Sequence, residues 1–141
     1  MDKILDMICA EYGNRIITEI EPKEKNKIES FITKALGVLQ EDGLYAFAIY
    51  TKSKRGDEGV EKKTAKILFN KSYELLKDSK IALLTNCDDF LKGIRTDLSN
   101  NLNHLLFAKE LLERTLVYAR YHAKALDKSE EKDSTEKAVD E

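Results

Sequence analysis

Residues that interrupt helices are scarce in this chain: its 141 residues include one proline and six glycines, and tryptophan is absent. So few helix-breaking residues leave few positions where a helix must end. Glu, Lys, Leu, Ile and Ala dominate, and no useful length of the chain alternates between polar and apolar residues as a half-buried strand would. The composition therefore predicts an all-α fold, a compact bundle of about five to seven helices with a long C-terminal helix.

Cysteine is also scarce, because Cys9 and Cys87 are the only two and they form no Cys-x-x-Cys pair. We expect both to be reduced and structural. Asp2, Lys3 and Asp6 interrupt the first apolar run, which argues against a signal peptide. No stretch approaches the roughly 18 apolar residues that a membrane span needs. These absences predict a cytoplasmic protein without a membrane contact.

The net charge of −2 is unevenly distributed. Residues 127–141 contain seven acidic residues and three lysines and carry −4, which leaves +2 on residues 1–126. We expect residues 1–126 to form one helical domain. Residues 127–141 have almost no apolar side chains, so we expect a disordered tail or a frayed extension of the last helix. A body this mildly basic would touch nucleic acid beside other subunits rather than alone.

Apolar spacing and stop signals divide the body into helices. The expected helices cover residues 2–20, 25–40, 44–54, 60–76, 88–95 and 101–126, with a short helix or buried loop over 80–84. Asn86 or Asp88 is the expected cap of the short helix 88–95, and Asn100 or Asn101 that of the last helix. The apolar residues of 44–54 are nearly continuous, which predicts that this helix is the most buried segment.

The last helix carries apolar residues on two opposite sides. The first stripe, spaced to lie on one helix face and to pack in the core, is Leu105, Leu112, Leu116, Ala119, Ala123 and Leu126. The second stripe lies about half a turn away and consists of Phe107, Leu111, Arg114, Tyr118 and Tyr121. A surface helix of a small protein needs only one apolar stripe. We therefore interpret the second stripe as a docking face for a partner, since Tyr and Arg are enriched among interface anchors.

Catalytic and metal-binding patterns are missing from the sequence. His104 and His122 lie eighteen residues apart, which is ~27 Å along one helix, so they cannot share an ion within one chain. Asp88 and Asp89 are adjacent and point apart on a helix, which favours a helix cap over a catalytic pair. The chain has no phosphate-binding glycine loop and no Gly-x-Ser-x-Gly motif. We expect neither an enzyme nor a metal or cofactor site.

Two groups of basic residues are candidate contacts for nucleic acid. Lys52, Lys54 and Arg55 lie in the charged segment at the end of the third helix, and Arg120 and Lys124 lie one turn apart on the last helix. Cations at such spacings can meet successive phosphates. The alternatives are a solvated loop for the first group and a structural helix face for the second.

Two segments resemble a known protein family. The first is LGVLQEDGLYAFAIYTKSK, residues 36–54, with Gly43-Leu44, Phe47 and Lys54, and the second is LVYARYHAKAL, residues 116–126, with Tyr118, Arg120 and Ala123-Lys124-Ala125. In both places the chain resembles the small all-helical subunit of type III-B CRISPR effector complexes, the Cmr complexes. The family often has proline where Leu36 or Gly37 stands and usually tryptophan where Tyr118 stands. These departures leave open a small subunit of another CRISPR effector subtype.

The resemblance implies a non-catalytic structural subunit that acts in antiviral defence. Copies of it would stack beside the filament of backbone subunits and help to bind the guide crRNA and the target RNA. On this hypothesis Arg120 and Lys124 line the RNA channel, the second stripe of the last helix meets a neighbour, and Gly43 and Leu44 serve folding. A helical adaptor that binds only proteins is one alternative, and an enzyme whose site forms between copies is another.

Overall fold

The computed structural model describes residues 2–20, 23–85 and 88–140, with side chains described as far as Leu126. Its elements are α1 (Lys3–Thr18), α2 (Lys25–Asp42), α3 (Leu44–Lys54), α4 (Val60–Lys77), α5 (Phe90–Gly93), the π-helix η1 (Ile94–Leu98) and α6 (Leu102–Asp140). The predicted all-α fold with a long C-terminal helix is confirmed, and no described residue lies in a strand. The predicted acidic tail, residues 127–141, falls outside the described side chains.

Helix ends follow local side-chain and glycine signals. Asn101, one of the two expected caps of α6, accepts a hydrogen bond through Oδ1 from the backbone N–H three residues on, at 3.1 Å. Asp89 caps α5 in the same way, accepting from the backbone N–H two residues on at 3.0 Å. The expected cap Asp88 is therefore wrong, and Asn86 lies outside the described residues. Between α2 and α3, Gly43 has a φ of +96°, which glycine adopts without a steric penalty.

Residues 80–84, expected as a short helix or a buried loop, form a loop of which only Leu84 is buried. Leu84 is fully buried, and the backbone N–H groups of Leu83 and Leu84 both donate to the carbonyl of Leu76 at the end of α4, at 3.0 Å. Ala82 in this loop has a φ of +50°. These contacts fold the loop back against the bundle instead of starting a new helix.

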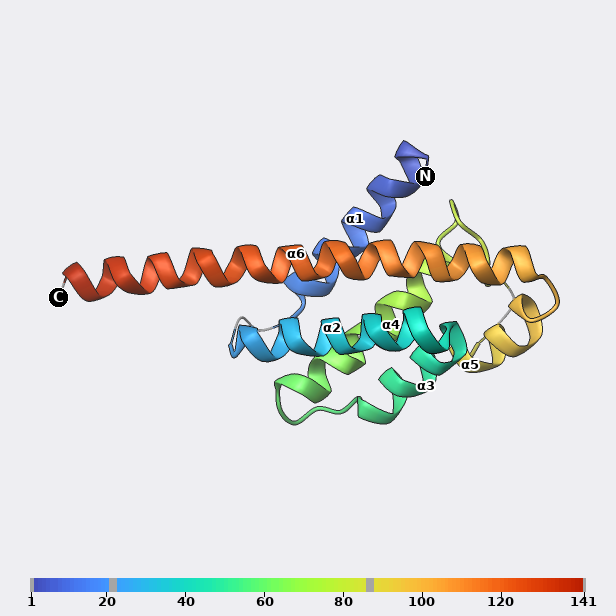
Figure 1. Cartoon of the computed structure of the whole chain (residues 1–141), viewed down its shortest axis with the longest axis horizontal. Helices are drawn as coiled ribbons and strands as arrows, with labels where there is room; N and C mark the ends of the chain where they lie inside the picture. The colour runs from blue at the N-terminus through green and yellow to red at the C-terminus, as the bar shows by residue number, and fades with distance from the viewer. Residues whose placement is uncertain (1, 21–22, 86–87, 141) are drawn as a thin grey trace.

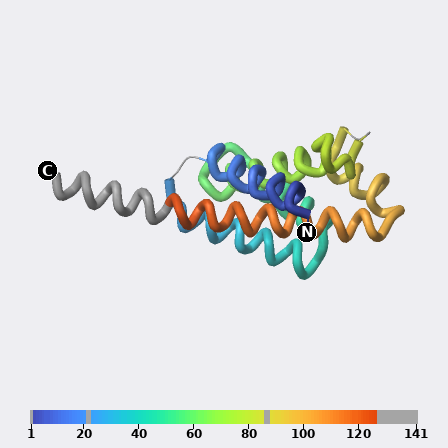
Figure 2. Tube along the Cα trace, turned by 90° about the horizontal axis from the view of Figure 1, so that it is seen from above, coloured from blue at the N-terminus to red at the C-terminus, as the bar shows by residue number. Residues whose placement is uncertain are grey.

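The core is built around α6, which runs antiparallel to α2 and is crossed by α1 (Figure 1). Seen from above, α1 lies along one side of α6 and α2 along the other (Figure 2). Within α6, Leu112, Leu116 and Ala119 are fully buried. Leu126, expected in the same stripe, is 36% exposed. This expectation is wrong because the buried part of the helix ends at Ala123, where the bundle ends.

Helix α3 is not the most buried segment, contrary to the sequence prediction. Only Leu44, Phe47, Ala48 and Thr51 are buried, and Ile49 is 44% exposed. The reason is geometric: α3 packs on α2 and α4 with one face, and the other face of an 11-residue helix stays in contact with solvent. A nearly continuous apolar run is therefore compatible with a half-exposed helix.

Helix α1 crosses α6 at Gly13, where the two backbones come close. A Cβ on Gly13 would lie 2.7 Å from Tyr118 Cβ and 3.0 Å from both the backbone nitrogen of Ala119 and the carbonyl oxygen of Thr115. A side chain at this position would push the helices apart. Glycine is thus required here by the close approach, not by its backbone angles.

A partly buried hydrogen bond fastens α1 to the end of α4. The Tyr12 hydroxyl donates to Asp78 Oδ2 at 2.9 Å, and Tyr12 is buried. Burial, followed by the hydrogen bond to Asp78, raises the pKa of Tyr12 to about 12. The pKa of Asp78 is lowered, mainly because the backbone N–H of Lys80 donates to its carboxylate. The neutral phenol and the charged carboxylate are therefore the forms that the fold favours.

We expect Gly13→Ala to lower the free energy of unfolding by about 1 to 3 kcal/mol, the usual cost of overpacking. Gly37→Ala is the matched control, because its Cβ would meet nothing within 4 Å. It should be neutral or stabilising by up to about 1 kcal/mol, since alanine has the higher helix propensity. Urea unfolding followed by circular dichroism measures both. Equal effects of the two substitutions would contradict the close crossing.

We expect alkaline pH to remove the contribution of Tyr12. The pKa of the phenol is about 10 in an unfolded chain and about 12 in the fold. The stabilisation is therefore complete below pH ~10, is lost as the pH rises through the folded pKa, and amounts to roughly 2 kcal/mol.

The measurement compares wild type with Tyr12→Phe, which cannot ionise at this position. Between pH 10 and 12 the unfolding free energy of wild type should fall toward that of the variant, because the other tyrosines titrate equally in both proteins. Parallel curves over this range would show that the fold does not raise the pKa of Tyr12.

Candidate nucleic-acid and partner surfaces

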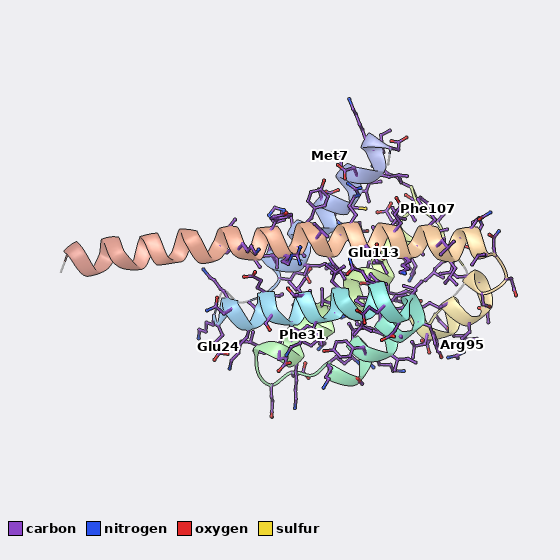
Figure 3. The ribbon with its side chains drawn as sticks, viewed as in Figure 1. Met7, Glu24, Phe31, Arg95, Phe107 and Glu113 are labelled. Atoms are coloured by element: carbon purple, nitrogen blue, oxygen red, sulfur yellow. The ribbon has the colours of Figure 1, made fainter. Side chains whose placement is uncertain are left out.

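The second stripe of α6 is largely covered by α1. Leu111 is fully buried, and the Cys9 thiol of α1 donates to its carbonyl oxygen at 3.5 Å. The assignment of Leu111 to a partner interface is therefore wrong, because the chain's own first helix occupies that side of α6. Phe107, labelled in Figure 3, is partly buried and packs against the same core.

Arg114 and Tyr118, two further members of the stripe, bind Asp6 of α1. Arg114 Nη1 donates to Asp6 Oδ1 at 3.1 Å, and the Tyr118 hydroxyl lies 2.9 Å from both carboxylate oxygens. Hydrogen bonding to Asp6 raises the pKa of Arg114 and that of Tyr118. Both side chains thus have a role within the chain. Tyr121, which is 60% exposed, and Arg114, whose side chain is 44% exposed, are the members of the predicted docking face that stay open to solvent.

The basic group on α6 faces α2. Lys124 Nζ lies 3.6 Å from Glu29 Oε1 of α2. Arg120 is partly buried, and its Nε is enclosed without a hydrogen-bond partner among the described residues. A phosphate at this position would have to compete with Glu29 for Lys124 and reach a guanidinium that is partly covered.

The basic group at the end of α3 is open. Lys52, Lys54 and Arg55 are exposed, and in the described part of the chain none of them forms an ion pair. Lys54 Nζ lies 5.9 Å from the Tyr50 ring centroid, and the Arg55 guanidinium carbon lies 4.8 Å from that of Phe69. Contacts with an aromatic face orient a cation without neutralising it. The three charges also oppose the negative end of the α3 dipole, but their outer surfaces stay available to an anion.

The lysines that follow this group differ in their partners. Lys66 Nζ forms an ion pair with Asp57 at 2.7 Å. Lys62 lies over Gly56, where a Cβ would meet its side chain at 3.0 Å. Lys62 and Lys63 are exposed and form no ion pair in the described chain, so they add to the free charge of Lys52, Lys54 and Arg55.

Helix α2 separates the two basic groups. In Figure 1, α6 runs on one side of α2, and the segment between α3 and α4 lies on the other side. The structure therefore does not unite Lys52, Lys54 and Arg55 with Arg120 and Lys124 in one groove. A nucleic acid that contacts both groups has to pass around α2.

Among the described residues, no three His, Cys, Asp or Glu side chains converge as a metal site requires. Among the same residues, no helix combines the length and the apolar character that spanning a membrane requires. The chain matches no protein-family model and no curated protein.

Sequence reasoning missed the exposed apolar residues of α1. Ile4 and Met7, on the outer side of its first two turns, are 66% and 65% exposed, and Figure 3 labels Met7 near the free end of the helix. At 3.6 residues per turn, Ile4 and Met7 lie on the other side of the helix from the buried Cys9 and Ile16. This position is the sequence signal that could have identified them as exposed. Part of the exposed apolar surface that the sequence predicted for α6 therefore lies on α1 instead.

We expect Asp6→Ala to lower the free energy of unfolding clearly more than Glu11→Ala does. Glu11 is an exposed acid of the same helix and pairs only with Arg15, one turn away, a kind of contact that contributes little. In a Tyr118→Phe background the loss caused by Asp6→Ala should be smaller, because one of its partners is already gone. Urea titrations of wild type, Asp6→Ala, Tyr118→Phe and the double variant measure this coupling, and Glu11→Ala is titrated beside them. A loss no larger than that of Glu11→Ala would show that Asp6 does not hold α1 on α6.

Proposed function

We propose that this protein is a non-catalytic, RNA-binding helical subunit of a cytoplasmic ribonucleoprotein assembly. The two sequence segments described above favour the small subunit of a type III CRISPR effector complex, which binds beside backbone subunits, other effector subunits and further copies of itself. The observation that carries the proposal is the open group of Lys52, Lys54 and Arg55, three exposed cations without an ion pair in the described chain.

The charge around this group favours a polyanion. Helix α3 contains no aspartate or glutamate along its 11 residues, so all of its charged side chains are cations. Displacement of counterions from a nucleic acid by such cations gives binding that weakens steeply with salt. Because the body carries only +2, we expect the isolated protein to bind RNA weakly and the assembly to bind it through many copies.

Arg120 and Lys124 remain a second proposed contact. Their pairing is weak enough to be exchanged, since the 3.6 Å contact between Lys124 and Glu29 is partly exposed, and such pairs contribute at most about 1 kcal/mol. We expect this group to contribute less than the group on α3, because Lys124 must first release Glu29.

A protein-only helical adaptor is the second candidate function. It is favoured by four apolar side chains that are more than half exposed: Ile4 and Met7 on α1, and Leu102 and Leu106 at the start of α6. Apolar residues gathered at a surface are typical of protein docking sites. The RNA experiment distinguishes the two candidates, because an adaptor needs no affinity for RNA.

We expect the triple variant Lys52→Glu/Lys54→Glu/Arg55→Glu to lose RNA affinity. The measurement is fluorescence anisotropy with a labelled single-stranded RNA several tens of nucleotides long, at two salt concentrations. Wild-type affinity should fall steeply between about 50 and 200 mM salt, and the triple variant should bind at least about tenfold more weakly at the lower salt.

The matched control is Lys3→Glu/Lys34→Glu/Lys80→Glu, which changes the net charge equally at three exposed lysines elsewhere. Its affinity should stay within about threefold of wild type, since overall charge alone acts weakly at such salt concentrations. Equal losses in the two triple variants would mean that no specific basic surface exists. If wild type fails to bind RNA at high micromolar concentration and low salt, the adaptor is the better assignment.

A further inference from the structure

Helix α3 has an outward face that the cluster of cations at its end does not explain. Tyr45, Ile49 and Lys52 are spaced i, i+4 and i+7, which places them along one face of the helix. Tyr45 is half-buried, Ile49 is 44% exposed, and Lys52 is exposed. An aromatic ring, an aliphatic side chain and a cation therefore follow one another along ~11 Å of surface.

Arg95 of η1 extends this face at its aromatic end. Its Nη1 donates to the Tyr45 hydroxyl oxygen at 2.7 Å, and its guanidinium carbon lies 5.8 Å from the centroid of the Tyr45 ring. Figure 3 labels Arg95 where η1 lies beside α3. Arg95 is exposed and forms no ion pair in the described chain. The hydrogen bond fixes the phenol and the guanidinium beside each other at the surface.

We call Tyr45, Ile49, Lys52 and Arg95 the α3 strip. Its two cations are unpaired, and Lys54 and Arg55 add two more at one end. The acidic residues closest to the strip in sequence are Asp42 and Asp97, and the Thr96 hydroxyl donates to Asp97 at 3.2 Å. Beyond Arg55 come Asp57, which pairs with Lys66, and Glu58. The strip is thus a cationic surface with exposed apolar and aromatic groups between its charges.

We infer that the α3 strip binds single-stranded RNA through its bases as well as its phosphates, an inference that rests on the proposed function. One base stacks at Tyr45 and Arg95, the neighbouring nucleotide contacts Ile49, and Lys52 meets the phosphate that follows. Planar bases stack on aromatic rings and guanidinium groups, largely without regard to sequence. A single strand is required because the bases of a duplex are stacked on each other and cannot reach a flat protein surface.

Charge favours RNA over a protein as the occupant. A protein partner for the strip would need an acidic surface matched to four unpaired cations, and it would gain little from an exposed ring held beside a guanidinium. A single-stranded nucleic acid supplies repeated negative charges and repeated flat apolar faces together. Within the length of one helix, the strip offers cations that match the negative charges, and an aromatic and an aliphatic side chain that match the flat apolar faces.

The test separates stacking from charge. Tyr45→Leu removes the ring but keeps an apolar side chain, and Tyr45→Phe keeps the ring but loses the hydrogen bond to Arg95. We expect Tyr45→Leu to weaken RNA binding by about tenfold with an unchanged salt dependence. Tyr45→Phe should stay within about threefold of wild type. Lys52→Gln should instead reduce the slope of log affinity against log salt by about one.

Two further arms complement the affinities: one locates the contact in wild type, and the other separates charge from stacking. Single-stranded RNA carrying 4-thiouridine, cross-linked to wild type by light and mapped by mass spectrometry, should mark residues 44–54. Inorganic polyphosphate, which has charge but no bases, should bind wild type and Tyr45→Leu equally. Circular dichroism melting curves show that each variant is folded.

Each outcome has a separate meaning. Cross-links only within residues 116–126, together with unchanged affinity of Tyr45→Leu, overturn the α3 strip but leave an RNA-binding protein. An equal loss of RNA and polyphosphate binding in Tyr45→Leu overturns base stacking. Absence of RNA binding by wild type overturns both this inference and the proposed function.

Discussion

The crossing of α1 over α6 at Gly13 is the contact on which the rest of the arrangement depends. Because Gly13 has no side chain, α1 lies close enough for Asp6 to reach Arg114 and Tyr118, with hydrogen bonds of 2.9 to 3.1 Å. The same placement brings Tyr12 to Asp78 at the end of α4. With α2 on its other side, α6 becomes a central helix, and most residues of its two apolar stripes are used inside the chain, whereas Leu126 and Tyr121 stay exposed. The exposed apolar groups lie on the outer faces of α1 and α3 and on the two ends of the packed part of α6.

Local patterns in the sequence were sufficient to place the helices along the chain. They were not sufficient to show which helices pack against one another. The bounds of α3 and the cap at Asn101 depend on residues close in sequence, and both were predicted correctly. The second stripe of α6 was predicted as a stripe, but periodicity cannot tell whether its cover comes from the same chain or from a partner. Asp6 lies 108 residues from Arg114 in the sequence, and no local pattern joins them. The assignment of Leu111 to an interface failed for this reason.

The same limit explains the error on α3. A helix whose residues are nearly all apolar is predicted to be buried on every side. A helix that packs through one face, however, buries only about half of its side chains. Leu44, Phe47 and Thr51 point into the core, whereas Tyr45 and Ile49 do not. The candidate site was thus partly visible in advance: Lys52, Lys54 and Arg55 were identified, but Arg95 comes to Tyr45 only through the fold.

The two basic surfaces can be ranked by what a phosphate has to displace from each cation. A phosphate at Lys124 replaces a carboxylate that is already present, so its net gain is the difference between two similar interactions. A phosphate at Lys52 replaces water and mobile ions, and the release of counterions from the RNA is then not offset by a lost ion pair. Exposure of Ile49 points to the same surface, because the 44% of this residue that is open to water contributes no burial energy to an isolated fold. A ligand with flat apolar faces and negative charge accounts for both features at once, which is why α3, rather than α6, is the better candidate for the nucleic-acid contact.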